Sequence, residues 1–331
     1  MSNAAFYQLG PLREYLEDPT VFEVRINQFQ EVICDTFSGR RVVKNAAITA
    51  EFIRNLTKAL LSINKLTMGP INDVTLPGGI RGIICLPPAV IDDTAAVAFR
   101  KNLAADKDLE QLTSEGIFSD CRKITGGKQS LTDDDHLLKE LHGSENWPVF
   151  LKAAVEKKRT IVVCGETGSG KTVLTRSLLK AVHKDERVII LEDVHEVDAP
   201  HVIEAVYMLY GRGNQVGRVT ATEGLKACMR LTPGRIFMTE LRDDAAWDYL
   251  QALNTGHPGG LTSTHANSAR DAFNRIGLLI KATPIGRMLD MSDIMRMLYS
   301  TIDVVVHMEK RKIKEIYFDP EYKMQCVNVN L

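Results

Sequence analysis

Residues 165–172 read Gly165-Glu166-Thr167-Gly168-Ser169-Gly170-Lys171-Thr172, and this stretch decides the fold of the chain. It matches the pattern GxxxxGK[ST] in full, follows the strand-like TIVVC and precedes the helical run VLTRSLLKAV. The glycines allow the loop to wrap a phosphate with its backbone N–H groups, and the helix N-terminus adds positive potential. In this pattern Lys171 reaches the β- and γ-phosphates, and the Thr172 hydroxyl holds Mg²⁺. The eight residues therefore predict a site for ATP and Mg²⁺.

Polar side chains follow three further strand-like segments. RVIIL is followed by Glu192, RIFMT by Glu240 and Arg242, and GLTST by His265. Short strands rich in β-branched residues alternate here with helical patterns, which favours a largely parallel sheet covered on both faces. Ligands bind at the carboxyl ends of the strands in such sheets. We therefore expect the phosphate loop, the two glutamates and the histidine at one edge of an α/β sheet.

These residue types suit hydrolysis of a γ-phosphoryl group, which requires Mg²⁺ and a group that orients water. A carboxylate can accept a hydrogen bond from that water, or hold the metal through the metal's own solvent shell. A histidine beside the γ-phosphate can change hydrogen-bond partner when the phosphate leaves. The sequence does not decide which glutamate polarises the water. We favour Glu240 for the water and place Glu192 near the metal.

The chain before Trp147 has a different pattern. The segments VFEVRIN, EVICDTF and RGIICLPP are strand-like, and apolar residues at three- and four-residue spacing in EFIRNLTKALLSINKL predict a helix. The segment from Ser119 to Asn146, with its Gly-Gly pair and three consecutive aspartates, is typical of a connection with one short helix. We predict an N-terminal α+β domain (1–118), a linker (119–146) and a P-loop domain (147–331).

Composition narrows the possible classes of protein. The 331 residues are 44% hydrophobic and 25% charged, which excludes a disordered or fibrous chain. A formal net charge of -1 argues against a globally basic nucleic-acid binder. The closest cysteines, Cys85 and Cys121, are 36 residues apart, so there is no CxxC pair. The first twenty residues do not form a signal peptide, and no apolar run approaches the ~20 residues of a membrane span. We expect a soluble, intracellular protein without an integral membrane segment.

Four stretches resemble the secretion (traffic) ATPases in sequence and order: GETGSGKT, ILEDVHEVD, RLTPGRIFMTELRDDAAWDYLQALNTGHPGG and LTSTHANSARDAFNRI. The phrase ALNTGHPGGLTSTHANSA is most similar to the type IV secretion branch, the VirB-eleven-like hexameric ATPases that also serve plasmid conjugation. The resemblance is strong over roughly residues 150 to 280 and weaker in the segments LPGGIRGIICLPPAV and FRKNLAADKDLEQLTSEGIF.

The resemblance implies a RecA-like P-loop domain and a ring, expected to be a homohexamer. It also implies other secretion-system subunits as partners, with the ATPase peripheral on the cytoplasmic face of the inner membrane. DNA and protein both stay open as transported substrates. Residue by residue it implies phosphate and magnesium roles for Lys171 and Thr172, the acidic-box role for Glu192, the Walker B role for Glu240, the histidine-box role for His265, and a nucleotide contact for Arg100.

The chain departs from the family's pattern at three positions. The family usually has Asp at Gly234, Gly at Thr239 and Gly at Asp243. None of these changes removes a charged catalytic group, but they leave the details of the Walker B turn open.

Three other functions remain open at this stage. Type II secretion and pilus-retraction motors share these boxes, although the cysteine spacing excludes the tetracysteine zinc insert of many assembly members. A RecA-like DNA motor predicts DNA-stimulated ATPase activity and a basic channel. A nucleotide switch that does not hydrolyse ATP predicts no phosphate release.

Overall fold

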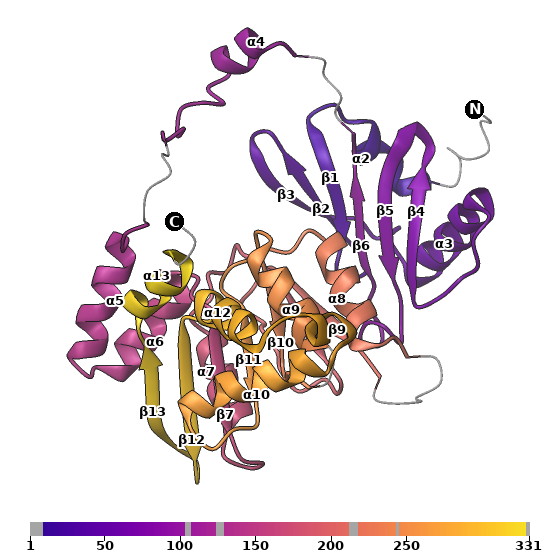
Figure 1. Ribbon diagram of the computed structural model, residues 1–331. Coiled ribbons are helices and arrows are strands. Elements are labelled where there is room, and N and C mark those ends of the chain that lie inside the picture. The colour runs from indigo at the N-terminus through magenta and orange to yellow at the C-terminus, as the bar shows by residue number, and fades with distance from the viewer. Residues whose placement is uncertain (1–8, 103–106, 124–128, 212–217, 243–244, 329–331) are drawn as a thin grey trace.

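The computed structural model describes residues 9–102, 107–123, 129–211, 218–242 and 245–328, and Figure 1 shows two sheets within them. The first part of the chain forms η1 (Gly10–Leu12), α2 (Arg13–Glu17), β1 (Val21–Ile26), β2 (Glu31–Thr36), β3 (Gly39–Lys44), α3 (Ala50–Asn64), β4 (Ile71–Leu76), η2 (Pro77–Gly79), β5 (Ile80–Cys85) and β6 (Ala96–Arg100). The remainder forms α4 (Leu109–Ser114), α5 (Asp133–Gly143), α6 (Trp147–Glu156), β7 (Ile161–Gly165), α7 (Lys171–Leu179), β8 (Arg187–Glu192), β9 (Glu204–Leu209), α8 (Ala221–Arg230), β10 (Arg235–Met238), α9 (Ala245–Asn254), β11 (Leu261–Thr264), α10 (Ala269–Ala282), α11 (Pro284–Met288), α12 (Met291–Thr301), β12 (Val304–Glu309), β13 (Lys312–Phe318) and α13 (Pro320–Asn328).

The N-terminal sheet has the strand order β3-β2-β1-β6-β5-β4, and neighbouring strands pair antiparallel. The predicted strands at β1, β2 and β5 and the predicted helix at α3 are confirmed. Helix α3 begins where the Thr49 side chain accepts a hydrogen bond from the Phe52 N–H, and ends at Lys65, whose φ is 57°. It lies against β4, and its apolar residues share a core with alternate residues of β5 and β6, including Ile84 and Val97. The intervening residues of those strands face the second sheet.

The C-terminal sheet has the order β13-β12-β7-β11-β10-β8-β9. Its strands are parallel except β13, which forms an antiparallel hairpin with β12. Alternate residues of β7 point to opposite faces: Val162 packs with α8, α9, α10 and α12, and Val163 packs with α5, α6 and α7. This arrangement confirms the α/β class, the largely parallel sheet and its covering on both faces.

Helix α5 lies inside the segment 119–146 that the sequence indicated as a connection. Thr132 caps it by accepting a hydrogen bond from the Asp135 N–H, while the Asp135 carboxylate accepts one from the Thr132 N–H. Leu138 is 0% exposed and packs with Phe150 of α6 in the core of the C-terminal sheet. The aspartates that suggested a loop thus stabilise a helix start, where negative charge is favourable. We infer that the connection ends before α5.

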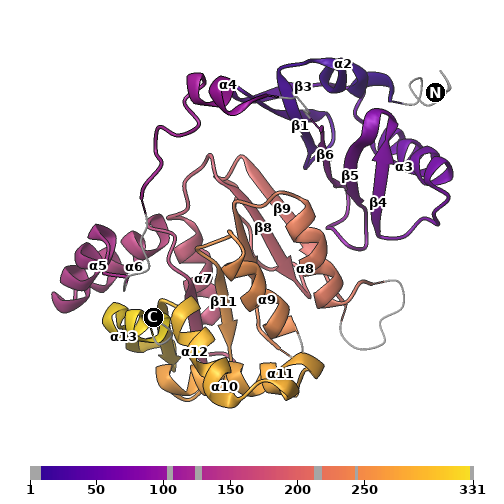
Figure 2. The same cartoon turned by 45° about the horizontal axis from the view of Figure 1, so that its top comes forward.

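The two sheets meet through an apolar contact and a charge cluster that joins β1 to the starts of β8 and β9. Figure 2 shows the two sheets from a second direction. Cys85 and Ala96 of the N-terminal sheet pack with Met208 of β9, and Val90 forms an isolated bridge with Met208. The members of the buried charge cluster are Glu23, Arg25, Asp35, Arg40, Arg187 and Glu204.

Arg25 and Glu204 form the centre of this cluster, with side chains 2% and 0% exposed. Arg25 Nε donates to Glu204 Oε2 at 2.8 Å, and Arg25 Nη2 donates to Asp35 Oδ1 at 2.7 Å. Arg187 Nη1 reaches the same Glu204 Oε2 at 2.9 Å. Because Arg25 belongs to β1 and Glu204 to β9, these ion pairs join the two sheets. In the described part of the chain no helix is long and apolar enough to cross a membrane.

Candidate functional site

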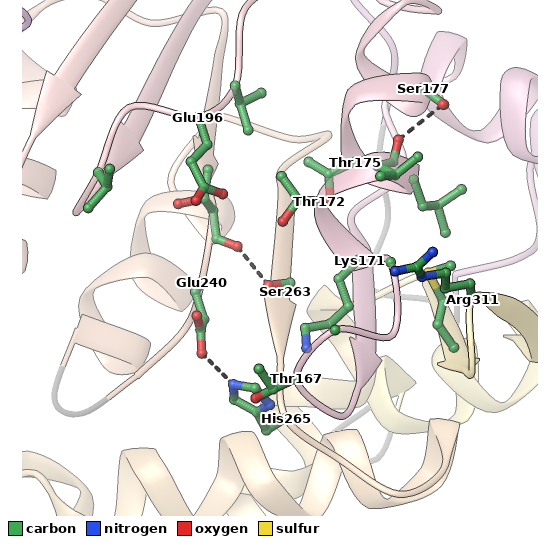
Figure 3. Close-up of a pocket in the computed structure, with 18 of the residues that line it drawn as sticks. Thr167, Lys171, Thr172, Thr175, Ser177, Glu196, Glu240, Ser263, His265 and Arg311 are labelled. Carbon is green, nitrogen blue, oxygen red and sulfur yellow. Dashed lines mark hydrogen bonds and ion pairs between the residues drawn. The ribbon is translucent and has the colours of Figure 1, made fainter.

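A cavity of about 1120 Å³ opens at the carboxyl edge of the C-terminal sheet. The glycine-rich loop after β7, the loops after β8, β10 and β11, and the β12–β13 hairpin line it. Figure 3 shows Lys171, Thr172, Glu240 and His265 around this space. The strand order places β7, β11, β10 and β8 side by side, so the four predicted strand ends lie at one edge, as expected.

The glycine-rich loop is shaped by contacts that exclude side chains. Gly165 has a φ of 149°, and a Cβ there would overlap the Met308 carbonyl oxygen on β12. Gly170 has a φ of 97° and forms the N-cap of α7. Ser169 is 1% exposed, and its Oγ has no hydrogen-bond partner among the described residues. The loop therefore brings Thr167, Gly168 and Gly170 to the cavity at the start of α7, a position that suits a phosphate, while the Ser169 hydroxyl is buried.

Lys171 and Thr172 follow at the first turn of α7. Lys171 Nζ donates to the carbonyl oxygens of Gly165 at 2.8 Å and Glu166 at 2.9 Å. Burial lowers the pKa of the Lys171 ammonium, and the Glu240 carboxylate acts in the opposite direction. The lysine is thus held against its own loop by neutral carbonyl groups. An anionic phosphate is a stronger partner for an ammonium than a carbonyl oxygen is.

On the other side of the cavity, Glu240 lies between His265 and Arg242. His265 Nε2 lies 2.9 Å from Glu240 Oε1, and Arg242 Nη2 donates to Glu240 Oε2. The Glu240 side chain is 17% exposed and that of His265 is 42% exposed, so both are accessible from the cavity. The sequence placed these residues after β10 and β11, and the structure brings them together.

The structure does not bring Glu192 to the cavity. Its side chain is 1% exposed, with Oε2 3.0 Å from His195 Nδ1. Oε1 accepts hydrogen bonds from the backbone N–H groups of Glu196 and Val197, both at 3.2 Å. Burial raises the pKa of Glu192, although His195 lowers it in part. Glu192 therefore organises the loop after β8, while the exposed Glu196 of that loop lines the cavity.

Two basic regions differ from what the sequence indicated. Arg100 is exposed at the end of β6 and does not line the cavity of its own chain. Arg311 and Lys312, which no motif singled out, do line it from the β12–β13 hairpin. The only sequence signal for them is the basic run Lys310 to Lys314 after a strand, which by itself is typical of a solvated turn.

The departures from the family's pattern lie close to this site. Thr239 lines the cavity just before Glu240. A Cβ at Gly234 would lie 2.9 Å from the Arg187 carbonyl oxygen, so an aspartate there would require the backbone to shift. Asp243 lies outside the described residues.

This chain is similar to known secretion-system proteins over nearly its whole length. A family model described as "Type II/IV secretion system protein" matches residues 138–315. The type IV secretion system protein VirB11 of Bartonella quintana is 33% identical over 330 residues, covering 95% of this chain and 92% of that protein. VirB11 of Brucella suis biovar 1 is 34% identical over 330 residues, with 96% and 91% covered.

A solved structure is similar to the same extent. The crystal structure of the VirB11 ATPase from the Brucella suis type IV secretion system, in complex with sulphate, superimposes with a TM-score of 0.91. The two chains are 33% identical, and the match covers 98% of this chain and 96% of that one. The similarity therefore includes the N-terminal sheet as well as the P-loop half.

Proposed function

This chain belongs to the type II/IV secretion system protein family, and from that premise we propose that it is the ATP-hydrolysing motor of a type IV secretion or conjugation machine. One observation carries the proposal. A complete phosphate loop shares a cavity with a glutamate that is paired to a histidine and an arginine. A binding protein without activity requires only the loop, whereas hydrolysis also requires a carboxylate that can organise water.

The cavity fits a nucleotide and a divalent cation. The loop residues Thr167, Gly168 and Gly170 line the cavity with Lys171 and can offer backbone and ammonium donors to phosphate oxygens, and the buried Ser169 hydroxyl of the same loop has no partner of its own among the described residues. Mg²⁺ would be held by the Thr172 hydroxyl and, through water, by Glu196, because Glu192 is enclosed by its own loop. When bound, the metal neutralises charge on the β- and γ-oxygens.

The Glu240 group has the geometry for a step that depends on the phosphate. In this structure both carboxylate oxygens of Glu240 are paired, one to His265 and one to Arg242. A γ-phosphate near these two side chains competes for their N–H donors. We infer that His265 and Arg242 turn toward it, which frees Glu240 to accept a hydrogen bond from the attacking water. His265 returns to Glu240 once the phosphate has left, so its partner depends on the state of the nucleotide.

The assignment to type IV secretion, rather than to pilus retraction, type II secretion or a DNA motor, is supported by relatives named VirB11 that match 95% or more of the chain. We extend the proposal to a homohexameric ring, to secretion-system partner subunits and to a peripheral position on the cytoplasmic face of the inner membrane. DNA and protein both remain possible substrates.

Arg100 belongs to the ring proposal. Since it is exposed and outside the cavity of its own chain, a contact with nucleotide requires a second copy or a rearrangement of the two sheets. If that contact forms, Arg100→Ala weakens nucleotide affinity by about 1–3 kcal/mol, the range for a charged hydrogen bond. It also blunts any nucleotide-dependent tightening of the oligomer in sedimentation. Unchanged affinity and sedimentation would remove Arg100 from the site.

The proposed function is tested by phosphate release and by transfer. We expect the purified chain to release phosphate from ATP in the presence of Mg²⁺. EDTA should abolish this activity, and the activity should not require DNA. In the source bacterium, deletion of the gene should abolish conjugation or effector secretion, and wild type but not Glu240→Gln should restore it. Normal transfer with lost pilus retraction would assign the chain to the retraction motors.

A further inference from the structure

The β12–β13 hairpin forms one wall of the cavity, and the proposed hydrolysis assigns it no role. Its tip, Lys310–Arg311, has φ angles of 49° and 63°, so the chain reverses there within two residues. The Arg311 Cα would lie 3.7 Å from a Cβ at Gly170, which places the tip against the start of α7. Met308, Arg311 and Ile313 line the cavity from this hairpin.

The sheet order fixes which end of a nucleotide the hairpin meets. Strand β7, which carries the phosphate loop, lies between β12 on one side and β11 and β10 on the other. Glu240 and His265 follow β10 and β11, so the γ-phosphate belongs on that side. A nucleotide whose β-phosphate sits in the loop therefore has its nucleoside directed away from Glu240, toward β12 and β13.

The hairpin offers both an apolar surface and a cation there. Ile313 is 39% exposed, and the Met308 side chain reaches Gly170, so the two supply flat apolar contact. Among the described residues, the Arg311 side chain has no hydrogen bond or ion pair, unlike Arg242 and Lys171. Figure 3 shows Arg311 beside Lys171, reaching toward the cavity from the hairpin. A planar guanidinium over an aromatic ring is attractive, and arginine stacks better than lysine does.

We propose that the β12–β13 hairpin binds the nucleoside end of ATP, with Arg311 stacked on the base and Met308 and Ile313 packed around it. This inference rests on the proposed ATPase function. Arg311 then binds the nucleoside and takes no part in the cleavage of the phosphate bond.

The test compares Arg311→Gln with wild type, using ATP, ADP and inorganic tripolyphosphate as ligands. We expect ATP and ADP to bind about threefold to thirtyfold more weakly, the range of a cation–π contact. Tripolyphosphate, which has no base, should bind both proteins equally. The KM for ATP should rise by a similar factor with kcat nearly unchanged. Lys314→Gln is the matched control, because Lys314 is an exposed cation of the same hairpin that does not line the cavity.

Three results would overturn the inference while leaving the ATPase function intact. These are unchanged ATP affinity in Arg311→Gln, an equal loss with tripolyphosphate, or an equal loss in Lys314→Gln. A folded wild type that neither binds nor hydrolyses ATP would instead overturn the proposed function. Circular dichroism and the thermal midpoint of each variant show that the hairpin is still folded.

Discussion

The two ends of the C-terminal sheet carry similar charged residues in opposite conditions. At the starts of β8 and β9, Arg187 and Glu204 are buried, and Glu204 pairs with both Arg187 and Arg25. At the carboxyl edge, Lys171 and Glu240 face a cavity of about 1120 Å³. The first group has almost no access to water, while the second is paired only with groups that a ligand can replace. The difference separates charges that hold the fold from charges that bind.

The pKa shifts follow the same division. Burial would raise the pKa of Glu204, but hydrogen bonds and charge from Arg25 and Arg187 outweigh it, and the pKa is lowered. Glu192, at the other end of β8, has one histidine and two backbone N–H groups as partners, and burial keeps its pKa raised. Arginine partners therefore lower the pKa of a buried carboxylate, whereas a histidine and backbone N–H groups do not outweigh the effect of burial.

The largest expected effect is on activity at the open end. Lys171→Ala should leave a folded protein without measurable ATPase activity, because it removes the phosphate cation without opening a core cavity. Phosphate release and the thermal midpoint measure the two parts of this prediction, with exposed Lys180→Ala as control. Near-normal phosphate release by Lys171→Ala would contradict the assignment of residues 165–172 as the phosphate loop. A large fall in its thermal midpoint would show that Lys171 also stabilises the fold, contrary to the difference proposed between the two ends of the sheet.

The next effect is on stability at the closed end. Arg25→Ala should lower the free energy of unfolding by about 3–5 kcal/mol, because it leaves the buried Glu204 and the partly buried Asp35 with less positive charge around them. Urea unfolding measures the change. Arg40→Ala should cost clearly less, since the Arg40 side chain is 27% exposed. Equal losses in the two variants would contradict the importance of burial at this end.

A third prediction distinguishes the acids near the cavity. Glu240→Gln keeps the size of the side chain but loses its charge, so ATP should still bind while turnover falls by ~10² or more. Single-turnover kinetics and nucleotide binding measure these separately. Glu196→Gln should mainly raise the Mg²⁺ concentration needed for activity. If Glu240→Gln turns over normally and Glu192→Gln does not, Glu192 rather than Glu240 is the carboxylate that organises the water.

The smallest expected effect is the pH dependence of the closed end. Because the folded pKa of Glu204 lies below 4.5, its ionisation stabilises the fold above that pH. This contribution is lost as the pH falls through the lowered, folded pKa. The difference in unfolding free energy between wild type and Glu204→Gln should therefore be constant from neutral pH to about 4.5 and narrow below it. If this difference in unfolding free energy instead widens as the pH falls, the pKa of Glu204 in the folded protein is raised and not lowered.

Much of the fold could be predicted from local patterns. The strands at β7, β8, β10, β11 and β12 are short segments rich in β-branched or other apolar residues, and such segments can be recognised without tertiary information. Strand β13 escaped prediction because its burial changes from exposed to buried along its length, giving no period of two. Strand β9 alternates in burial, but its partly buried positions, Ala205, Tyr207 and Leu209, are also apolar, so the sequence shows no alternation of apolar and polar residues. Helix α5 is the short helix expected within 119–146, but the sequence did not show that Leu138 packs this helix into the core of the C-terminal sheet.

The site was predictable where residues follow a strand directly. Lys171, Glu240 and His265 sit at strand ends, and parallel pairing brought them together. The sequence could not tell that Glu192 points into its own loop while Glu196, four residues later, faces the cavity. The sequence also could not predict that Arg311 lines the cavity, because the pairing of β12 with β7 brings it there.

The buried charge cluster also limits how this chain can evolve. A domain is stable by only about 5–15 kcal/mol, so one substitution costing about 3–5 kcal/mol uses much of the margin that selection tolerates. Arg25 contacts Glu23, Asp35 and Glu204 at once, so the cost of changing any member depends on the others. We expect these positions to be inherited as a block, changing together or not at all, while exposed residues around them drift freely.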